Sequence, residues 1–324
     1  MKGPLDPIRV GADIGNATTT IAVDDQVVSF LPSFVSPQAG EYEGMSRITT
    51  DRHHIVYGRT AYVVGADAPG EMGYDSLLTK AAPGEEWRRY TSDRAIVVFL
   101  AALSAAYPQA DRLAVRLATG APMSVYEEHG AAIAKRYSGE HRYTYNGHER
   151  IVNVVECVVH GEGSQVMTWV DPALRLGNVV VHDIGGRTYN AIAYKDGAMI
   201  GKPKTLALGV EHLLDRVAVS SDPAARFAML GKMRGDAKAH ADVRRRLIDL
   251  LGVGLETLNG KINLSKVHRH LVIGGGAEFL AAALRVSALT GGEVITLGGD
   301  RPETVNALSY AAALHATKAR KEAA

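Results

Sequence analysis

Two stretches of this chain consist of strand-like apolar runs on either side of a short glycine turn. Residues 179–194 read VVVHDIGGRTYNAIAY, in which β-branched residues lead into Asp183 and a second strand-like run follows the glycine pair. Residues 8–23 read IRVGADIGNATTTIAV and repeat the pattern, with Asp13 before the turn. In both copies a threonine stands five residues after the aspartate. The repeat predicts two β-hairpins and suggests that the chain has two related halves.

Strand-like and helix-like segments alternate along the rest of the chain. Thr91, Ser92 and Asp93 offer N-caps for a helix over residues 94–107 that is apolar on almost every side, so we expect it to be buried. Further helices are predicted at residues 124–137, 165–176, 210–219, 223–234, 240–259, 277–289 and 304–321. Further strands are predicted at residues 112–119, 142–145, 149–159, 271–273 and 293–297. This order predicts an α/β fold with mixed sheets flanked by helices.

The composition bounds the size and the partners of the protein. Its 324 residues, of which 46% are hydrophobic, suit two soluble domains. The 36 lysine and arginine residues nearly balance the 35 aspartate and glutamate residues, so no strong overall field favours nucleic acid or an acidic membrane. We interpret the arginine run at residues 244–246 as a solvated helix face, because consecutive helical residues point in different directions.

Cys157 is the only cysteine of the sequence, which excludes an internal disulfide and fits a reducing cytoplasm. Two valines follow it and favour a buried, unreactive thiol. The N-terminus has no apolar core of signal-peptide length, and no apolar run approaches the roughly 20 residues of a membrane span. We therefore expect a cytoplasmic protein.

The two aspartate–glycine turns carry the candidate chemistry. A glycine turn lets backbone N–H groups approach an oxyanion without a Cβ in the way, and a nearby carboxylate can hold a hydrated magnesium ion. Two such turns could hold one nucleoside triphosphate, although a plain turn has the same pattern. Residues 271–279, LVIGGGAEF, add a short strand, three glycines and a helix, which suits close approach of a flat or charged ligand. The Walker pattern is absent, because none of the three Gly-Lys pairs is followed by Ser or Thr.

The order of these motifs resembles a known superfamily. D-x-G near the start, D-I-G-G near the middle and I-G-G-G-A before a late helix are similar to the first phosphate loop, second phosphate loop and adenosine loop of the actin, chaperone and sugar-kinase ATPases. The tail at residues 300–310, DRPETVNALSY, is similar to the closing segment of bacterial actin-like proteins. Within the superfamily the chain resembles the plasmid-segregating actins of the ParM/StbA type.

The resemblance implies an actin-like fold, in which two related α/β domains, with mixed sheets flanked by helices, surround a nucleotide cleft. Domain I would span residues 1–173, with a C-terminal helix at 304–324 packed back on it. Domain II would span residues 174–303 and include a small helical subdomain at about 211–268.

The resemblance also implies roles for individual residues. Asp13 and Asp183 would act in catalysis by holding Mg²⁺, through water, beside the phosphates. Glu162, in V-V-H-G-E-G-S, would orient the attacking water, with Gln165 as the alternative. The implied nucleotide-binding residues are Gly15, Asn16, Ala17 and Thr18 in the first loop, Gly185, Gly186, Arg187 and Thr188 in the second, Gly209 and Glu211 at a helix start, and Gly274, Gly275, Gly276 and Glu278 in the adenosine loop.

Two positions depart from the pattern of the family. Thr20 occupies the position at which actin and the ParM type carry a lysine that reaches the phosphates. Arg187 occupies a position in the second loop at which a small or hydroxyl residue is common. Arg187 either replaces the missing positive charge or points to solvent.

The function that the resemblance implies is that of an ATPase that binds ATP and Mg²⁺, polymerises into filaments and hydrolyses ATP, with GTP as the alternative nucleotide. Its partners would be further copies of itself and a DNA-binding adaptor protein on a plasmid centromere, without direct contact to nucleic acid or membrane. Two alternatives stay open. One is a kinase for a sugar or other small metabolite on the same fold, and the other is a non-filamentous ATPase scaffold in cell division or pilus assembly.

Overall fold

A computed structural model describes residues 6–38, 53–70, 75–76, 87–217, 222–235, 238 and 240–322. These residues divide into two compact units. The first unit comprises the described residues up to Ala121, Val125–His160 and the chain from Tyr310 onward, and the second comprises Pro122–Ser124 and Gly161–Ser309. The domain boundaries inferred from the sequence stay a prediction, and parts of the predicted helical subdomain and both chain ends lie outside the described residues.

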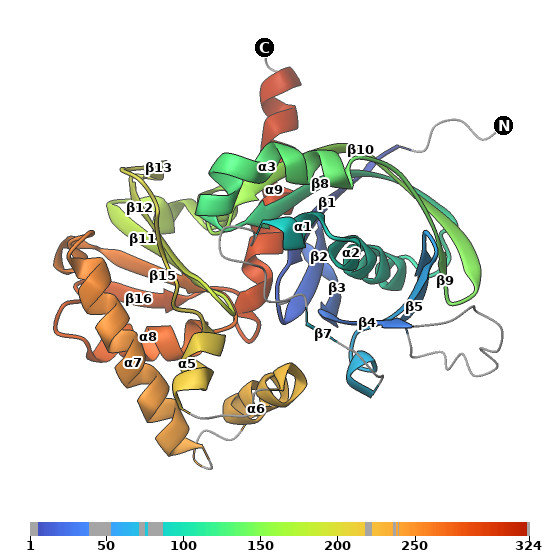
Figure 1. The fold of residues 1–324 in the computed structure, drawn as a ribbon. Coiled ribbons are helices and arrows are strands. Elements are labelled where there is room, and N and C mark those ends of the chain that lie inside the picture. Colours follow the sequence, from blue (N-terminus) through green and yellow to red (C-terminus); the bar gives the residue numbers. More distant parts are fainter. Residues whose placement is uncertain are drawn as a thin grey trace. The chain divides into compact units, whose positions relative to one another are not determined.

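The first unit is built on one large mixed sheet (Figure 1). Within the described residues the strand order is β3-β2-β1-β8-β10-β9-β5-β6-β4-β7, with β1 antiparallel to β2 and parallel to β8. The strands are β1 (Ile8–Ile14), β2 (Thr18–Val23), β3 (Gln26–Pro32), β4 (Phe34–Gln38), β5 (His53–Tyr57), β6 (Thr60–Val64), β7 (Asp75–Ser76), β8 (Arg112–Ala121), β9 (Gly139–Tyr145) and β10 (His148–Gly161). The helical elements are η1 (Ala68–Gly70), α1 (Arg88–Thr91), α2 (Asp93–Ala106) and α3 (Met123–Tyr137).

Helix α2 supplies much of the core of the first unit. The Ser92 hydroxyl caps it by accepting a hydrogen bond from the Ala95 amide at 3.3 Å. Every residue from Ala95 to Ser104 is buried, and the helix packs against β2, β3 and β5. The prediction of a helix over residues 94–107 that is buried on all sides is confirmed.

The second unit is built on a smaller mixed sheet. Within the described residues its strand order is β13-β12-β11-β15-β16, and β14 pairs with β12. The strands are β11 (Asn178–Ile184), β12 (Tyr189–Lys195), β13 (Ala198–Met199), β14 (Lys204–Leu206), β15 (Arg269–Ile273) and β16 (Glu293–Thr296). The helical elements are α4 (Val166–Trp169), η2 (Pro172–Arg175), α5 (Val210–Arg216), α6 (Pro223–Gly235), α7 (Ala241–Asn259), η3 (Leu264–Lys266), α8 (Ala277–Val286), η4 (Pro302–Thr304) and the start of α9 (Val305–Glu322). From Tyr310 onward α9 belongs to the first unit.

Helices cover both faces of the second sheet. On one face Val180 and Ala191 pack in a cluster with residues of α5, α7 and α8 (Figure 1). On the other face Val181 and Ile192 pack in a cluster with residues of α4 and the first residue of α9. Neighbouring residues of one strand therefore serve opposite faces, as the alternation of side chains requires. The predicted α/β fold with mixed sheets flanked by helices is confirmed.

The predicted helix over residues 165–176 is wrong in its second half. Helix α4 ends at Trp169, and Val170 has an extended backbone. The Asp171 carboxylate then accepts a hydrogen bond from the Ala173 amide at 2.7 Å and caps the 3₁₀ helix that begins at Pro172. Proline lacks an N–H group and disfavours helical backbone in the residue before it, so one continuous helix cannot pass through this point.

Two observations concern the reactivity of the cysteine and the presence of a membrane-spanning helix. Cys157 on β10 is half-buried, and burial raises the pKa of its thiol to about 12. The thiol therefore stays protonated at neutral pH, as expected for an unreactive cysteine. In the part of the chain that the structure describes, no helix combines the length and the apolar character that crossing a membrane requires.

Candidate functional site

The first aspartate–glycine turn joins β1 to β2. Asp13 is the penultimate residue of β1 and lies opposite Thr20 on β2. The Gly15 amide donates to the Thr18 carbonyl at 3.0 Å and closes the turn. A Cβ on Gly15 would lie 2.8 Å from that same oxygen, so a larger residue would have to displace the turn.

Asn16 and Ala17 form the tip of the first turn. The Ala17 carbonyl accepts from the Ser33 amide at 2.9 Å, which ties the tip to the connection between β3 and β4. Asn16 is 8% exposed, and its side-chain oxygen has no hydrogen-bond partner among the described residues. A buried acceptor of this kind fits a site in which a ligand or an ordered water supplies the donor.

The second turn joins β11 to β12 and has the same construction. Asp183 is the penultimate residue of β11 and lies opposite Asn190 on β12. The Gly185 amide donates to the Thr188 carbonyl at 2.9 Å. In both units the aspartate therefore pairs with the residue seven positions later, and the equivalent backbone bond closes the turn. The two predicted hairpins and their repeat are confirmed in the backbone.

The start of α5 contacts the second turn. The Val210 amide donates to the Gly185 carbonyl at 3.0 Å, and the Glu211 amide donates to the Gly186 carbonyl at 2.8 Å. These bonds satisfy N–H groups that have no partner within the helix itself. Gly209 approaches so closely that a Cβ there would lie 2.2 Å from the Gly186 oxygen. Gly209 and Glu211, both predicted from the sequence, thus meet the turn through their backbone.

The glycines after β15 also lie against the end of β11. Gly274 has φ +90°, and a Cβ there would lie 2.7 Å from Asp183 Oδ1. The Gly276 amide donates to the Ile184 carbonyl at 3.0 Å. A Cβ on Gly275 would meet nothing within 4 Å. The structure therefore brings the predicted adenosine loop next to the second aspartate.

Glu278, at the start of α8, forms an ion pair with Arg244 on α7. The guanidinium of Arg244 also lies 5.4 Å from the centroid of the Phe279 ring, and its side chain is 18% exposed. The interpretation of the arginine run as a solvated face is therefore wrong for Arg244, because this residue faces α8. Arg245 and Arg246 are exposed, as expected.

Asp183 is almost completely enclosed. It is 4% exposed, and burial raises the pKa of its carboxyl group to about 6. The side-chain amide of Asn306 donates to Asp183 Oδ2 at 2.9 Å, which favours the ionised form and opposes the effect of burial. The oxygen of the same amide accepts from the Gly163 backbone at 3.0 Å. The start of α9 and the turn after β10 therefore meet at this aspartate.

Glu162 lies in that same turn, directly before Gly163. The side-chain amide of Asn190 donates to Glu162 Oε2 at 3.2 Å, and the Thr205 hydroxyl donates to Asn190 Oδ1 at 2.7 Å. A Cβ on Gly163 would lie 3.4 Å from Asp183 Cβ. The second unit thus brings Glu162 and its turn to the end of β11, where Asp183 lies.

Two asparagines that the sequence interpretation did not assign hold these two carboxylates. Asn190 contacts Glu162, and Asn306 contacts Asp183. Both stand in segments that the sequence had singled out, the second hairpin and the tail motif. The sequence alone does not indicate which residue an asparagine side chain contacts in the folded protein. Gln165, the alternative to Glu162, donates to the neighbouring Ser164 hydroxyl at 3.3 Å.

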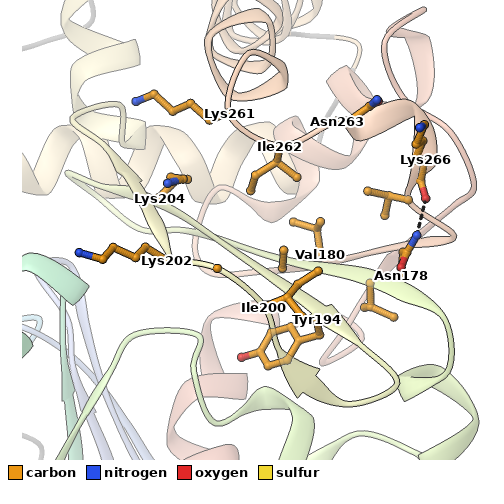
Figure 2. A pocket seen from close by; sticks show the side chains of 14 residues that line it. Asn178, Val180, Tyr194, Ile200, Lys202, Lys204, Lys261, Ile262, Asn263 and Lys266 are labelled. Carbon is orange, nitrogen blue, oxygen red and sulfur yellow. Dashed lines mark hydrogen bonds between the residues drawn. The ribbon is translucent and has the colours of Figure 1, made fainter.

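A pocket of about 360 Å³ lies elsewhere in the second unit (Figure 2). It is lined by β11, the end of β12, the connection from β13 to β14 and residues 261–267. Figure 2 shows Lys202, Lys204 and Lys261 extending toward the same side of it. None of the predicted phosphate or adenosine residues lines this pocket, so it is separate from the candidate site.

Comparison with known proteins identifies the fold. Residues 11–164 match the protein family described as "Actin like proteins N terminal domain". A search among curated proteins finds no match. Among solved structures, the apo psk41 ParM protein aligns over 98% of this chain and 100% of that chain, with a TM-score of 0.69 and 14% sequence identity.

Two further solved structures have the same architecture. ParM from Bacillus thuringiensis with ATP aligns over 97% of this chain and 100% of that chain, with a TM-score of 0.67 and 16% identity. An AlfA filament bound to AMPPNP aligns over 98% of both chains, with a TM-score of 0.64 and 16% identity. The fold is therefore the actin fold. Residues 11–164, just under half of the chain, match the N-terminal domain of actin-like proteins, in agreement with this fold.

Proposed function

We propose that this protein is an actin-like ATPase that binds ATP with Mg²⁺, polymerises into filaments and hydrolyses ATP to segregate plasmid DNA through a DNA-binding adaptor. One observation carries the proposal: an aspartate–glycine turn with the same closing bond occurs in each unit. The fold supports it, because one neighbour is described with ATP and another as a filament bound to AMPPNP. The tail motif at residues 300–310 supports the plasmid-segregation role.

The residues of the two turns fit a magnesium–nucleotide complex. Asp13 and Asp183 would hold Mg²⁺ through water, since magnesium usually keeps several waters and needs only one or two carboxylates beside the phosphates. In the described part of the chain no group of three or more His, Cys, Asp or Glu side chains could hold a metal directly. The unpaired oxygen of Asn16 would accept from a metal-bound water. Bound Mg²⁺ would offset the negative charge of the phosphate oxygens.

The backbone supplies the remaining contacts of the proposed site. N–H groups of Gly15, Asn16, Ala17 and Thr18, and of Gly185, Gly186, Arg187 and Thr188, would donate to phosphate oxygens. Gly209 and Glu211 would contact the ribose, and Gly274, Gly275, Gly276 and Glu278 the adenosine. Thr20, at the position of the lysine in the family, is 1% exposed and carries no charge. Arg187 is the only residue of the two turns with a cationic side chain.

Hydrolysis needs a polar group that orients a water in line with the γ-phosphate. We assign this role to Glu162, whose carboxylate Asn190 holds by a 3.2 Å hydrogen bond. Asn190 is 1% exposed and is itself fixed by Thr205, so the carboxylate has a defined support.

Assembly and turnover of the purified protein test the proposal. Light scattering and pelleting should rise with Mg²⁺ and ATP and should stay low with ADP or with ATP and a chelator, and phosphate release should follow assembly. Absence of ATP-dependent assembly over a wide range of protein concentrations would contradict the filament role. Turnover that requires an added sugar would instead indicate the kinase alternative.

A pair of variants ties the activity to the second turn. Asp183→Asn keeps the size of the side chain but removes its charge, and we expect it to lose Mg²⁺-dependent turnover. Asp25→Asn, at an exposed position between β2 and β3, is the matched control and should assemble and hydrolyse ATP as the wild type does. Equal activity of the two variants would exclude Asp183 from the site.

A further inference from the structure

The second residue of α9, Asn306, makes two side-chain contacts at the candidate site. Asn306 is 5% exposed. Its Nδ2 donates to Asp183 Oδ2 at 2.9 Å, and its Oδ1 accepts from the Gly163 amide at 3.0 Å. A backbone N–H can only donate, so the amide oxygen must face Gly163 and the amide nitrogen must face Asp183. The orientation of this amide is therefore determined by its partners.

These contacts join three segments that are far apart in the sequence. Asp183 stands at the end of β11, Gly163 in the turn after β10, and Asn306 at the start of α9. Gly163 has φ +76° and directly follows Glu162. Because one planar peptide unit joins the two residues, a displacement of Gly163 also displaces Glu162. The Asn306 side chain thus positions the Asp183 carboxylate directly and the Glu162 carboxylate through the backbone of Gly163.

Hydrogen bonds just before α9 and a buried residue at its start hold the beginning of this helix in place. The Gly274 amide donates to the Pro302 carbonyl at 3.0 Å, and the Thr304 hydroxyl donates to the Arg301 carbonyl at 2.8 Å. Val305 belongs to the buried cluster on one face of the second sheet. A side chain on a helix held in this way can fix its partners within the small tolerance that catalysis demands.

We propose that Asn306 is a positioning residue for ATP hydrolysis, which holds the Asp183 carboxylate and the turn of Glu162 in one relative arrangement. The inference rests on the proposed ATPase function. Asn306 acts through its two partners and does not touch the reacting atoms. Displacing groups that act in the transition state lowers the rate of in-line attack more than it lowers nucleotide affinity.

Two variants separate the two contacts. Asn306→Ala removes both of them. Asn306→Asp has the same shape and keeps an oxygen for the Gly163 amide, but it places a second carboxylate oxygen against Asp183. Ser309→Ala is the matched control, because this buried serine lies one turn along α9 and its hydroxyl donates to the Asn306 carbonyl at 2.8 Å.

Hydrogen exchange at the Gly163 amide measures the bridge without any hydrolysis. We expect exchange to be faster on the order of tenfold in Asn306→Ala, and unchanged in Asn306→Asp and Ser309→Ala. In both Asn306 variants kcat should fall on the order of tenfold to a hundredfold. The Kd for AMPPNP should change by less than about threefold. Ser309→Ala should keep the kcat and the Kd of the wild type.

Results of three kinds would overturn the proposal. Wild-type kcat in Asn306→Ala or Asn306→Asp, or a loss of AMPPNP affinity as large as the loss in kcat, would exclude the positioning role. Wild-type exchange at Gly163 in Asn306→Ala would exclude the bridge. A wild-type protein without ATP hydrolysis would refute the proposed function itself, which distinguishes that failure from the other two. If Asn306→Ala does not fold, the isosteric Asn306→Asp provides the kinetic test.

Discussion

The side chain of His182 donates a 2.8 Å hydrogen bond to the side chain of His270 inside the second unit. The groups at the two ends of this chain of bonds set its direction. His270 Nε2 lies 2.8 Å from the Gly291 carbonyl, which can only accept, so His270 Nδ1 must accept from His182 Nε2. His182 Nδ1 must in turn accept from the Tyr189 hydroxyl at 2.6 Å. This direction requires that each ring carries one proton, and burial favours that state because it lowers the pKa of both histidines.

Tyr189→Phe tests this chain of hydrogen bonds. The variant keeps the ring but removes the hydroxyl that donates to His182 Nδ1, and it leaves a buried acceptor unsatisfied. We expect the free energy of unfolding to fall by about 1 to 3 kcal/mol. Urea denaturation followed by circular dichroism measures the loss. Tyr126→Phe, at a residue 37% exposed, is the control and should match the wild type. Equal stability of Tyr189→Phe and Tyr126→Phe would show that the hydrogen bond between Tyr189 and His182 does not stabilise the fold.

Gly209→Ala should displace the second turn. Its Cβ would lie 2.2 Å from the Gly186 oxygen and 2.3 Å from the Arg187 nitrogen, and neither backbone atom can move away without moving the turn. Overpacking of this kind costs about 1 to 3 kcal/mol of stability. We also expect weaker AMPPNP binding, measured by calorimetry, because the displaced amides are among those proposed to bind the phosphates.

Gly252→Ala provides the control for this substitution. Gly252 lies in α7, and a Cβ there would meet nothing within 4 Å. Alanine is a better helix former than glycine, so this variant should gain up to about 1 kcal/mol of stability and bind AMPPNP as the wild type does. Similar AMPPNP affinities for the two variants would show that the close approach of Gly209 has no role in binding.

His160 should make the stability of the protein depend on pH. Its ring stacks on Tyr310 with centroids 5.8 Å apart, and burial lowers the pKa of its imidazole from 6.5 to about 4. Between these two values the unfolded chain binds a proton that the folded chain does not. The free energy of unfolding therefore falls as the pH falls from 6.5 to about 4, and it is insensitive to this group outside that window. The full loss is at most about 3 kcal/mol.

His160→Phe keeps an aromatic ring beside Tyr310 but cannot titrate. Urea denaturation at pH about 7 and at pH about 4.5 should give a smaller difference in stability for this variant than for the wild type. If the wild type and the variant lose equal stability between these two pH values, the pKa of His160 is not lowered in the folded protein.

The parts of the fold that the sequence predicts are those whose cause is local. The aspartate–glycine turns follow from a strand, a carboxylate and a glycine within a few residues, and helix α2 follows from its cap at Ser92 and its apolar run. The prediction of one helix over residues 165–176 was wrong in its second half, although the signal that ends the helix is also local. The apolar residues before Pro172 suggested continuity, but the proline removes the N–H group that continuity needs.

The parts that the sequence could not predict depend on contacts between distant residues. Arg244 reads as one member of a charged run, and only the packing of α7 on α8 brings it to Glu278. Asn306 meets Asp183 across 123 positions of sequence and Gly163 across 143. Periodicity and motif spacing describe neither contact, because each depends on how whole elements pack. The supporting residues of a site are for this reason harder to find than its carboxylates.

Glu162→Ala separates hydrolysis from assembly. Glu162 stands in the turn after β10, where Asn190 holds its carboxylate, and the role assigned to it is to orient the attacking water. Removing such a group should slow phosphate release on the order of a hundredfold. Binding of AMPPNP and ATP-dependent assembly should persist, since neither needs the water. Phosphate release and light scattering recorded in the same sample measure both effects. Asn190→Ala should slow phosphate release less, because it loosens the Glu162 carboxylate without removing it. Wild-type phosphate release in Glu162→Ala would assign the role to another residue, and Gln165→Ala would then be the next variant to measure.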